Sequence, residues 1–255
     1  MAPTIISDSP DAVFIVTGGN RGLGLEHVKQ FLEKNKAKVV ATARQPAKAD
    51  QLNKLLKKHQ DRLSVVELDT SDEASVEAAA KKVQQLHPEG VDLILNNAGI
   101  QEPITRAIET SGKEYTRVLQ TNVVGPFLVT QHFLPLLKKK NTKVVVNTSS
   151  ILGSISANAA GTFKGMLLPY NSSKAAINMQ TAVLANDLKD EGFTIIALHP
   201  GWVQTDMGNA ASEFLGGKPP LDPQTSIAAQ HKVILSLTNS QNGQYLDWEG
   251  KQMDY

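Results

Sequence analysis

The 255-residue sequence contains no cysteine and carries almost no net charge. Without cysteine the chain cannot form disulfides or use a thiolate as nucleophile or metal ligand, which fits a reducing compartment. The balance of 26 Lys and Arg against 25 Asp and Glu leaves a net charge of +1, so no nucleic-acid partner is expected. The 6 histidines are scattered without ligand spacing, so no metal site is expected either.

Long apolar runs are also lacking. None approaches the roughly 18 residues of a membrane-spanning helix, and the first residues lack the basic start and apolar core of a signal peptide. We therefore expect a soluble, cytoplasmic protein with no membrane partner. The hydrophobic content of 41% is ordinary for a globular core, and the length suits one large α/β domain or two small ones.

Short strand-like apolar runs alternate along the chain with longer helical patterns such as Gly22–Lys34 and Ser71–Leu86. This alternation predicts βαβ units and a parallel sheet covered by helices on both faces. Because no linker separates two halves, the predicted fold class is α/β, with residues 1–255 forming a single doubly wound Rossmann-type domain with a parallel sheet of about seven strands. The clearest strand-like runs are Val13–Thr17, Lys38–Ala43, Leu63–Leu68, Val91–Leu95, Lys143–Thr148 and Thr194–Leu198.

Two stretches interrupt this alternation. Residues of about 151–169 are rich in Ala, Gly and Ser, and residues of about 205–223 contain several Gly and Pro. Both follow strands at their carboxyl ends, where ligands bind in such sheets. We expect these stretches to be substrate loops, and residues of about 12–150 to bind a dinucleotide.

The first strand runs into a glycine-rich turn and then a helix, with glycines at Gly18, Gly22 and Gly24. Such glycines let the backbone turn sharply and approach a pyrophosphate, while the amino end of the helix offers free N–H groups. The spacing G-x-x-x-G-x-G differs from the commonest dinucleotide fingerprint, and a lone glycine cluster also occurs in plain tight turns. Its place between the first strand and the first helix favours a phosphate cradle.

The second strand ends at Arg44, where an acidic residue would bind the adenosine ribose hydroxyls of NAD. A cation at this point, with Arg21 in the glycine turn, suits the 2′-phosphate of NADP instead, although either arginine can also be simply solvated. Asp69 ends the third strand. It is equally interpreted as an acceptor for the adenine amino group or as a cap of the following helix.

The most distinctive pair of residues is Tyr170 and Lys174, which stand four apart at the start of a long helical pattern. Both side chains then project from one helix face, where the ammonium would favour the phenolate and lower the pKa of the tyrosine. Ser149 and Ser150 place hydroxyl groups at the end of the preceding strand. Tyr-x-x-x-Lys is common by chance on solvated helices, so the pair gains weight only from its neighbours.

Other segments would border the same site. The fourth strand ends in Asn96-Asn97-Ala98-Gly99, whose small residues would let a ribose pass and whose amides could tie neighbouring strands. Asn122 precedes a Gly-Pro pair and predicts a kink in a long helix. Pro200 and Gly201 follow the sixth strand and would pass the nicotinamide.

Together these segments closely resemble the short-chain dehydrogenase/reductase family over almost the whole chain, with TGGNRGLG at 17–24, NNAG at 96–99, YNSSK at 170–174 and HPGWVQTDM at 199–207. The last run and the closing GQYLDWEG at 243–250 most resemble the carbonyl-reductase branch that includes the sniffer and C-factor proteins. The resemblance implies an NADPH-dependent oxidoreductase acting on a small carbonyl or alcohol substrate. It also implies a possible homodimer or homotetramer that pairs through the long helices, while members of this branch can also be monomeric. The C-factor likeness keeps open a nicotinamide-binding regulator that does little chemistry.

The resemblance further assigns roles to catalytic residues. Tyr170 would give a proton to the carbonyl oxygen, Lys174 would bind the nicotinamide ribose, Ser150 would hydrogen-bond the substrate, and Asn122 would hold a water that links Lys174 to solvent. The spacing from Ser150 to Tyr170 is longer than is usual in the family, so an insertion at 154–168 is expected to reshape the pocket. The residues expected to contact the cofactor are Gly18, Asn20, Arg21, Gly22, Leu23, Gly24, Arg44, Asp69, Thr70, Asn96, Ala98, Gly99, Tyr170, Lys174, Pro200, Gly201, Val203 and Thr205.

The segment Thr205–Pro223 carries Met207, Phe214 and Leu215 among glycines and prolines. A surface loop has little reason to hold such apolar groups unless they cover something, so we expect a mobile lid. The alternative is a short helix packed permanently on the core. An apolar pocket for a lipophilic or aromatic carbonyl compound is expected to be lined by this segment together with Ile151, Leu152, Met166, Leu167, Leu168 and Trp202.

Overall fold

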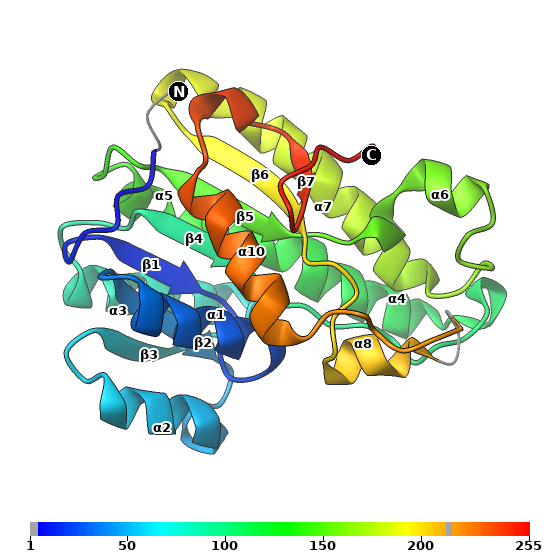
Figure 1. The fold of residues 1–255 in the computed structure, drawn as a ribbon, viewed down its shortest axis with the longest axis horizontal. Helices are drawn as coiled ribbons and strands as arrows, with labels where there is room; N and C mark the ends of the chain where they lie inside the picture. Colours follow the sequence, from blue (N-terminus) through cyan, green and yellow to red (C-terminus); the bar gives the residue numbers. More distant parts are fainter. Residues whose placement is uncertain (1–4, 213–215) are drawn as a thin grey trace.

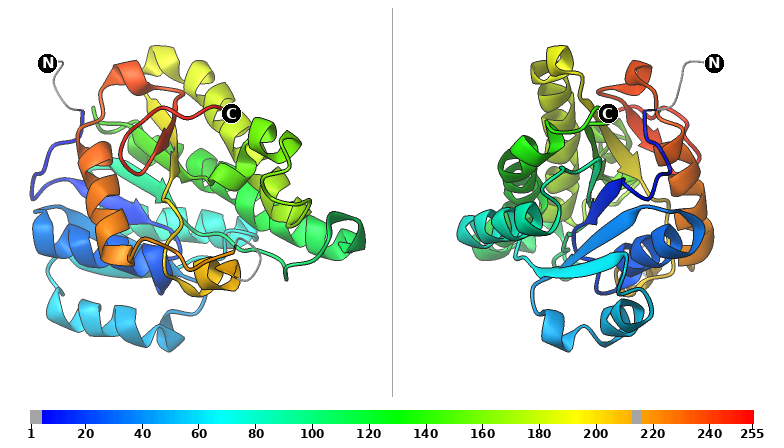
Figure 2. Two further views of the ribbon diagram at one scale, coloured as in Figure 1. Left: turned by 45° about the vertical axis from the view of Figure 1, so that its right-hand side comes forward. Right: turned by 90° about the vertical axis from the view of Figure 1, so that its left-hand side faces the viewer.

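The computed structural model describes residues 5–212 and 216–255, in which one parallel sheet of 7 strands lies between two layers of helices (Figures 1 and 2). The strand order is β3-β2-β1-β4-β5-β6-β7, and all neighbours are parallel. The strands are β1 (Val13–Val16), β2 (Lys38–Ala43), β3 (Leu63–Glu67), β4 (Leu93–Asn96), β5 (Val144–Thr148), β6 (Thr194–His199) and β7 (Tyr245–Asp247). The predicted doubly wound α/β class is confirmed.

The chain reverses its direction of travel across the sheet between β1 and β4. Strands β2 and β3 lie on one side of β1, whereas β4 to β7 follow on the other side. In such sheets the crevice at the carboxyl ends of the strands on either side of this reversal is where ligands bind. The glycine turn after β1 and the segment after β4 both open into this crevice.

Helices cover the two faces according to the alternation of side chains along the strands. Phe14 and Val16 of β1 belong to the core under α1, α2 and α10, whereas Val13 and Ile15 face α3, α5 and α7. The helices are α1 (Gly22–Lys34), α2 (Asp50–Lys58), α3 (Glu73–Leu86), α4 (Gly112–Leu119), α5 (Gly125–Leu137), α6 (Ile155–Ala159), α7 (Leu168–Asp187), α8 (Asp206–Ala210) and α10 (Pro223–Leu235). No helix among the described residues is long and apolar enough to cross a membrane.

Helices α4 and α5 are joined by a π-helical turn, Gln120–Val124. Pro126 lies in the first turn of α5, where the missing N–H of proline is tolerated. The helix expected to kink near Asn122 instead continues through this π-helical turn, which accommodates one added residue. Such turns are frequent at functional sites. This turn places the Asn122 side chain, 2% exposed, in the interior.

Two histidines far apart in the sequence meet between α1 and α10. His27 Nδ1 lies 3.0 Å from His231 Nε2, and the Phe31 ring stacks on His231. Burial lowers the pKa of both imidazoles, that of His231 to about 3, so the pair is neutral at pH 7. Among the described residues no group of three or more His, Asp or Glu side chains could hold a metal ion.

Candidate active site

The turn after β1 is shaped by two glycines. Gly18 has φ +67°, in the left-handed region, and a Cβ at Gly24 would collide with the Gly18 carbonyl oxygen. The side chain of the N-cap residue Arg21 does not cap α1, and the first turn of this helix carries no acidic residue. The positive end of the helix and its free N–H groups therefore fit a phosphate of a dinucleotide.

The ends of β1 and β4 are held together by Asn97 and Thr17. Asn97 Nδ2 donates to the Thr17 carbonyl oxygen at 2.9 Å, and Thr17 Oγ1 accepts from the Ala98 N–H at 3.0 Å. Asn96 is buried, and its Nδ2 donates to Asn147 Oδ1 of β5 at 2.9 Å. The two amides tie neighbouring strands as expected, so the Asn96 side chain is engaged within the sheet.

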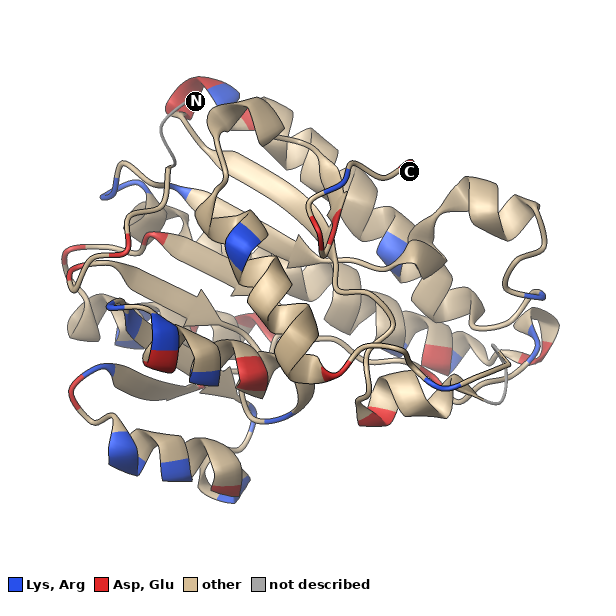
Figure 3. Ribbon diagram, viewed as in Figure 1, with Lys and Arg blue, Asp and Glu red and all other residues tan. Residues whose placement is uncertain are grey.

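Arg21 and Arg44 stand at the carboxyl ends of the neighbouring strands β1 and β2, and both are exposed. Arg21 Nη1 lies 3.7 Å from Asp206 Oδ2 at the start of α8, so the glycine turn contacts the segment expected to form the lid. Charges of both signs are interspersed over the molecule in the view of Figure 3.

The end of β3 is organised by two aspartates. Asp69 Oδ1 accepts from the Ser71 hydroxyl at 2.6 Å and from the Ser71 N–H at 2.9 Å. The cap of α3 is Asp72, whose side chain accepts from the Ala74 N–H. Asp69 is therefore not the helix cap, and the helix begins two residues later than expected. Thr70 is buried against Gly125, and a Cβ added to Gly125 would lie 2.8 Å from the carbonyl oxygen of Thr70.

Tyr170 lies in the first turn of α7, and Lys174 follows one turn later. The Lys174 Nζ is 5.4 Å from the centre of the Tyr170 ring and donates to the Thr148 carbonyl oxygen at 2.7 Å. Both side chains are buried, and Ser150 follows β5 beside them. The structure thus brings together a phenol, an ammonium and a hydroxyl, as the sequence predicts.

The expected lowering of the tyrosine pKa is wrong. Burial raises the pKa of Tyr170 to about 12, a hydrogen bond with Ser150 opposes this, and the Glu102 carboxylate adds to it. Lys174 does not reverse the effect, because its own lowered pKa leaves it uncharged at the alkaline pH where Tyr170 titrates. Burial also lowers the pKa of Lys174, to about 8.

The two serines after β5 have different partners. Ser149 Oγ donates to Asn178 Oδ1 of α7 at 2.6 Å, whereas Ser150 Oγ accepts from the Leu152 N–H at 3.2 Å. Asn122 holds the segment after β4, because its Oδ1 accepts from the Ile100 N–H at 2.9 Å and its Nδ2 donates to the Ile100 carbonyl at 2.8 Å. The side chain of Asn122 thus fixes backbone, and the expected water relay stays a prediction.

The inserted segment between Ser150 and Tyr170 folds into α6 and a loop. Leu167 is 1% exposed, so its expected place in the lining of a substrate pocket is wrong. Met166 and Leu168 line a cavity of about 350 Å³ against the face of α7 that carries Ala175, and Tyr170 is not among the residues that line it. The insertion therefore packs beside α7 more than over Tyr170.

The segment after β6 is tied both to α8 and to residues that follow it. Val203 pairs with Leu221 in a parallel bridge, and Trp202 Nε1 donates to the Gly208 carbonyl at 2.9 Å. Thr205 caps α8 by accepting from the Gly208 N–H. Two residues of the expected lid, Phe214 and Leu215, lie outside the described residues.

Glu102 is the site residue that the sequence interpretation missed. It follows the Asn-Asn-Ala-Gly segment, is 3% exposed, and accepts a hydrogen bond from the Tyr170 N–H. No local pattern pointed to it, because its partner is 68 positions away in the sequence.

Comparisons with known proteins agree with this geometry. The sequence profile of short chain dehydrogenases matches residues 12–215. An uncharacterized oxidoreductase of Schizosaccharomyces pombe is 35% identical over 248 residues, covering 93% of this chain and 96% of the relative. Among solved structures, the carbonyl reductase Sniffer of D. melanogaster has a TM-score of 0.87 at 32% identity, covering 96% of this chain and 99% of that one. An NADPH-bound carbonyl reductase from chicken fatty liver has a TM-score of 0.87 at 36% identity, with the same coverage of 96% and 99%.

Proposed function

Because the chain belongs to the short-chain dehydrogenase family, we propose that it is an NADPH-dependent carbonyl reductase. Its substrate would be a lipophilic or aromatic ketone or aldehyde, reduced to an alcohol or formed in the reverse reaction. The observation that carries this proposal is the buried group of Tyr170, Lys174 and Ser150 at the carboxyl edge of the sheet that also carries the glycine cradle. The NADPH bound to the chicken carbonyl reductase supports the choice of cofactor.

The chain's own residues supply the proton chemistry, while a bound NADPH would supply the hydride. Tyr170 holds its proton at neutral pH, because burial raises its pKa to about 12, and it can donate that proton to a carbonyl oxygen. The Ser150 hydroxyl would position that oxygen. Lys174, with its pKa lowered to about 8 by burial, lies in the range where it exchanges protons near neutral pH and can restore the phenol.

The experiment that tests this function is a panel of carbonyl compounds assayed by NADPH oxidation. We expect turnover of apolar ketones or aldehydes, with small charged carbonyl compounds as poor substrates. Tight binding of NADPH without oxidation across the panel would support a regulatory protein instead. A preference for small charged substrates would contradict the lipophilic substrate class.

We expect the segment 205–223 to close over bound ligands. Gln204, just before this segment, donates from Nε2 to the Pro219 carbonyl near its other end at 3.1 Å. Between these residues, α8 contacts the glycine turn through the exposed Arg21–Asp206 pair. An exposed pair is worth little, about 0–1 kcal/mol, so bound NADP can readily displace it. Hydrogen exchange of this segment should slow on adding NADP and a substrate analogue. Full protection in the ligand-free protein would mean a fixed wall.

We also propose that two copies pair through α5 and α7. Val124 just before α5 and Phe127 on α5 are each 38% exposed, and Met179 and Val183 on α7 are 66% and 57% exposed. Light scattering after size exclusion should give a dimer or tetramer for the wild type and a smaller species for Met179→Lys. Ile108→Lys changes an 84% exposed isoleucine outside these helices and is the matched control. A monomeric wild type would contradict the pairing.

A further inference from the structure

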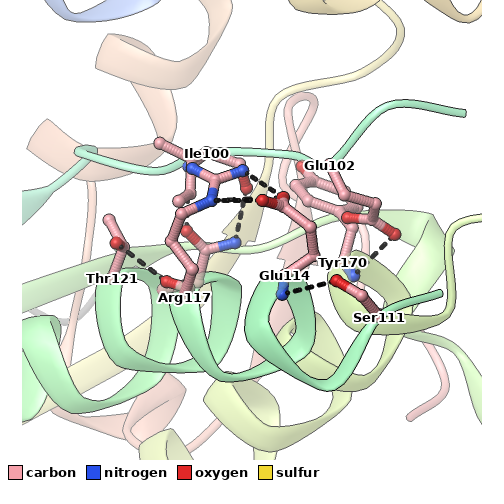
Figure 4. A network of polar contacts seen from close by, with 8 residues as sticks. Ile100, Glu102, Ser111, Glu114, Arg117, Thr121 and Tyr170 are labelled. Atoms are coloured by element: carbon pink, nitrogen blue, oxygen red, sulfur yellow. Dashed lines mark hydrogen bonds and ion pairs between the residues drawn. The ribbon is translucent and has the colours of Figure 1, made fainter.

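Glu102 holds the beginning of the catalytic helix. Tyr170 lies in the first turn of α7, and its backbone N–H donates to Glu102 Oε1 at 3.4 Å (Figure 4). A carboxylate is favourable at the positive end of a helix, and this contact joins the segment after β4 to α7. The position of the Tyr170 backbone therefore depends on Glu102.

The second oxygen of Glu102 is buried and has no hydrogen-bond partner among the described residues. A buried carboxylate with one unsatisfied oxygen is costly, and burial raises the pKa of Glu102. Capping of α7 uses only Oε1, so the buried second oxygen, which has no partner among the described residues, points to a further role for the carboxylate.

The Glu102 carboxylate also raises the pKa of the Tyr170 phenol, although burial is the larger cause. From α4, Glu114 and Arg117 face Glu102, but they are bound to each other at 2.7 Å and largely cancel (Figure 4). From α7, Lys174 Nζ donates to the Thr148 carbonyl, and its pKa of about 8 leaves it uncharged at the alkaline pH where Tyr170 titrates. From β7, Tyr245 is a neutral phenol whose own pKa is raised by burial.

We propose that Glu102 is a positioning residue that fixes the first turn of α7 and keeps the Tyr170 phenol in its proton-bearing form. The proposal rests on the role of Tyr170 as proton donor given above. In reduction, the phenol O–H bond breaks and the proton goes to the carbonyl oxygen as the hydride reaches the carbonyl carbon. In oxidation, the phenolate must accept that proton. A carboxylate beside the phenol disfavours the phenolate, so it biases the site toward carbonyl reduction at alkaline pH.

Three variants separate the charge of Glu102 from its hydrogen bond. Glu102→Gln removes the charge and keeps an acceptor for the Tyr170 N–H. Glu102→Asp keeps the charge and shortens the reach of the side chain. Glu109→Gln is the matched control, because Glu109 is an exposed carboxylate of the same connection that pairs with Arg106 at 3.8 Å.

The first readout does not need catalysis. The protein has 4 tyrosines, so ¹³C labelling at the ring carbon that bears the hydroxyl gives a few resonances, and Tyr170→Phe identifies that of Tyr170. In the NADP complex, Glu102→Gln should shift the titration of the Tyr170 resonance down by about 0.5–1 pH unit relative to wild type. Glu102→Asp and Glu109→Gln should titrate close to wild type.

The second readout is the pH profile of carbonyl reduction. The fall in kcat/KM at alkaline pH should begin at lower pH in Glu102→Gln by the same shift, because a deprotonated phenol cannot donate. If Tyr170 titrates at the same pH in wild type and in Glu102→Gln, the proposed role of the charge is overturned. If the titration of Tyr170 shifts equally in Glu102→Gln and Glu102→Asp, Glu102 is only a structural contact. Absence of any carbonyl reduction would refute the proposed function alone, since the resonance titration would still report the coupling.

Discussion

Replacing Tyr170 by phenylalanine should lower kcat for carbonyl reduction by about 10²- to 10⁴-fold while leaving NADPH binding nearly intact. The change removes only the hydroxyl of a side chain that is 8% exposed, so the packing of the ring is retained. Steady-state kinetics would measure the loss in kcat, and a fluorescence titration would measure the affinity for NADPH. Lys174→Ala should damage both quantities, because the ammonium would contact the ribose as well as restore the proton.

Tyr115→Phe is the matched control for the loss of a phenol beside α7. The Tyr115 hydroxyl donates to Ser172 Oγ at 3.1 Å, and it has no part in the proposed proton transfer. Its kcat should stay close to wild type. A Tyr170→Phe protein that reduces a good substrate at a near wild-type rate would assign the proton to another group.

Arg44→Asp should weaken NADPH binding by about 10- to 100-fold, which corresponds to the loss of about 1.5–3 kcal/mol from a charge-assisted hydrogen bond to the 2′-phosphate. The affinity for NADH should be unchanged or improved, because an acidic residue at this point accepts from ribose hydroxyls. Arg21 is the second candidate cation, and it would exchange its pairing with Asp206 for the phosphate.

Fluorescence titrations of both cofactors against wild type, Arg44→Asp and Arg106→Asp would measure this effect. Arg106 is an exposed arginine that pairs with Glu109, so Arg106→Asp makes the same charge change away from the cradle. Equal dissociation constants for NADPH and NADH in the wild type, or an unchanged NADPH affinity in Arg44→Asp, would refute the NADP assignment.

Much of the fold could be predicted because the parallel strands are buried on both faces and appear as short apolar runs. Helix α1 has the predicted bounds, Gly22–Lys34, since the glycine turn begins it and polar residues end it. Strand β7 was not predicted as a strand, because the 3 residues Tyr245–Asp247 are too few to show periodicity. Its place at the edge of the sheet depends on pairing with β6.

The proximity of Tyr170 and Lys174 could be predicted from the sequence, whereas their electrostatics could not. The four-residue spacing of Tyr170 and Lys174 places them together on any helix. The pKa of Tyr170 depends instead on its burial and on Glu102, which arrives from another part of the chain. Leu167 illustrates the same limit, since it has the left-handed φ of +58° and turns into the core, and no spacing rule predicts that.

The most direct test of the account follows the hydride. A carbonyl compound that the panel identifies as a substrate is incubated with NADPH that carries deuterium at both C4 positions of the nicotinamide, and the alcohol is analysed by mass spectrometry and NMR. We expect one deuterium on the carbinol carbon for each NADPH oxidised, and loss of this product in Tyr170→Phe. Binding of NADPH with no deuterium transferred to any carbonyl compound of the panel would contradict the assignment as a carbonyl reductase.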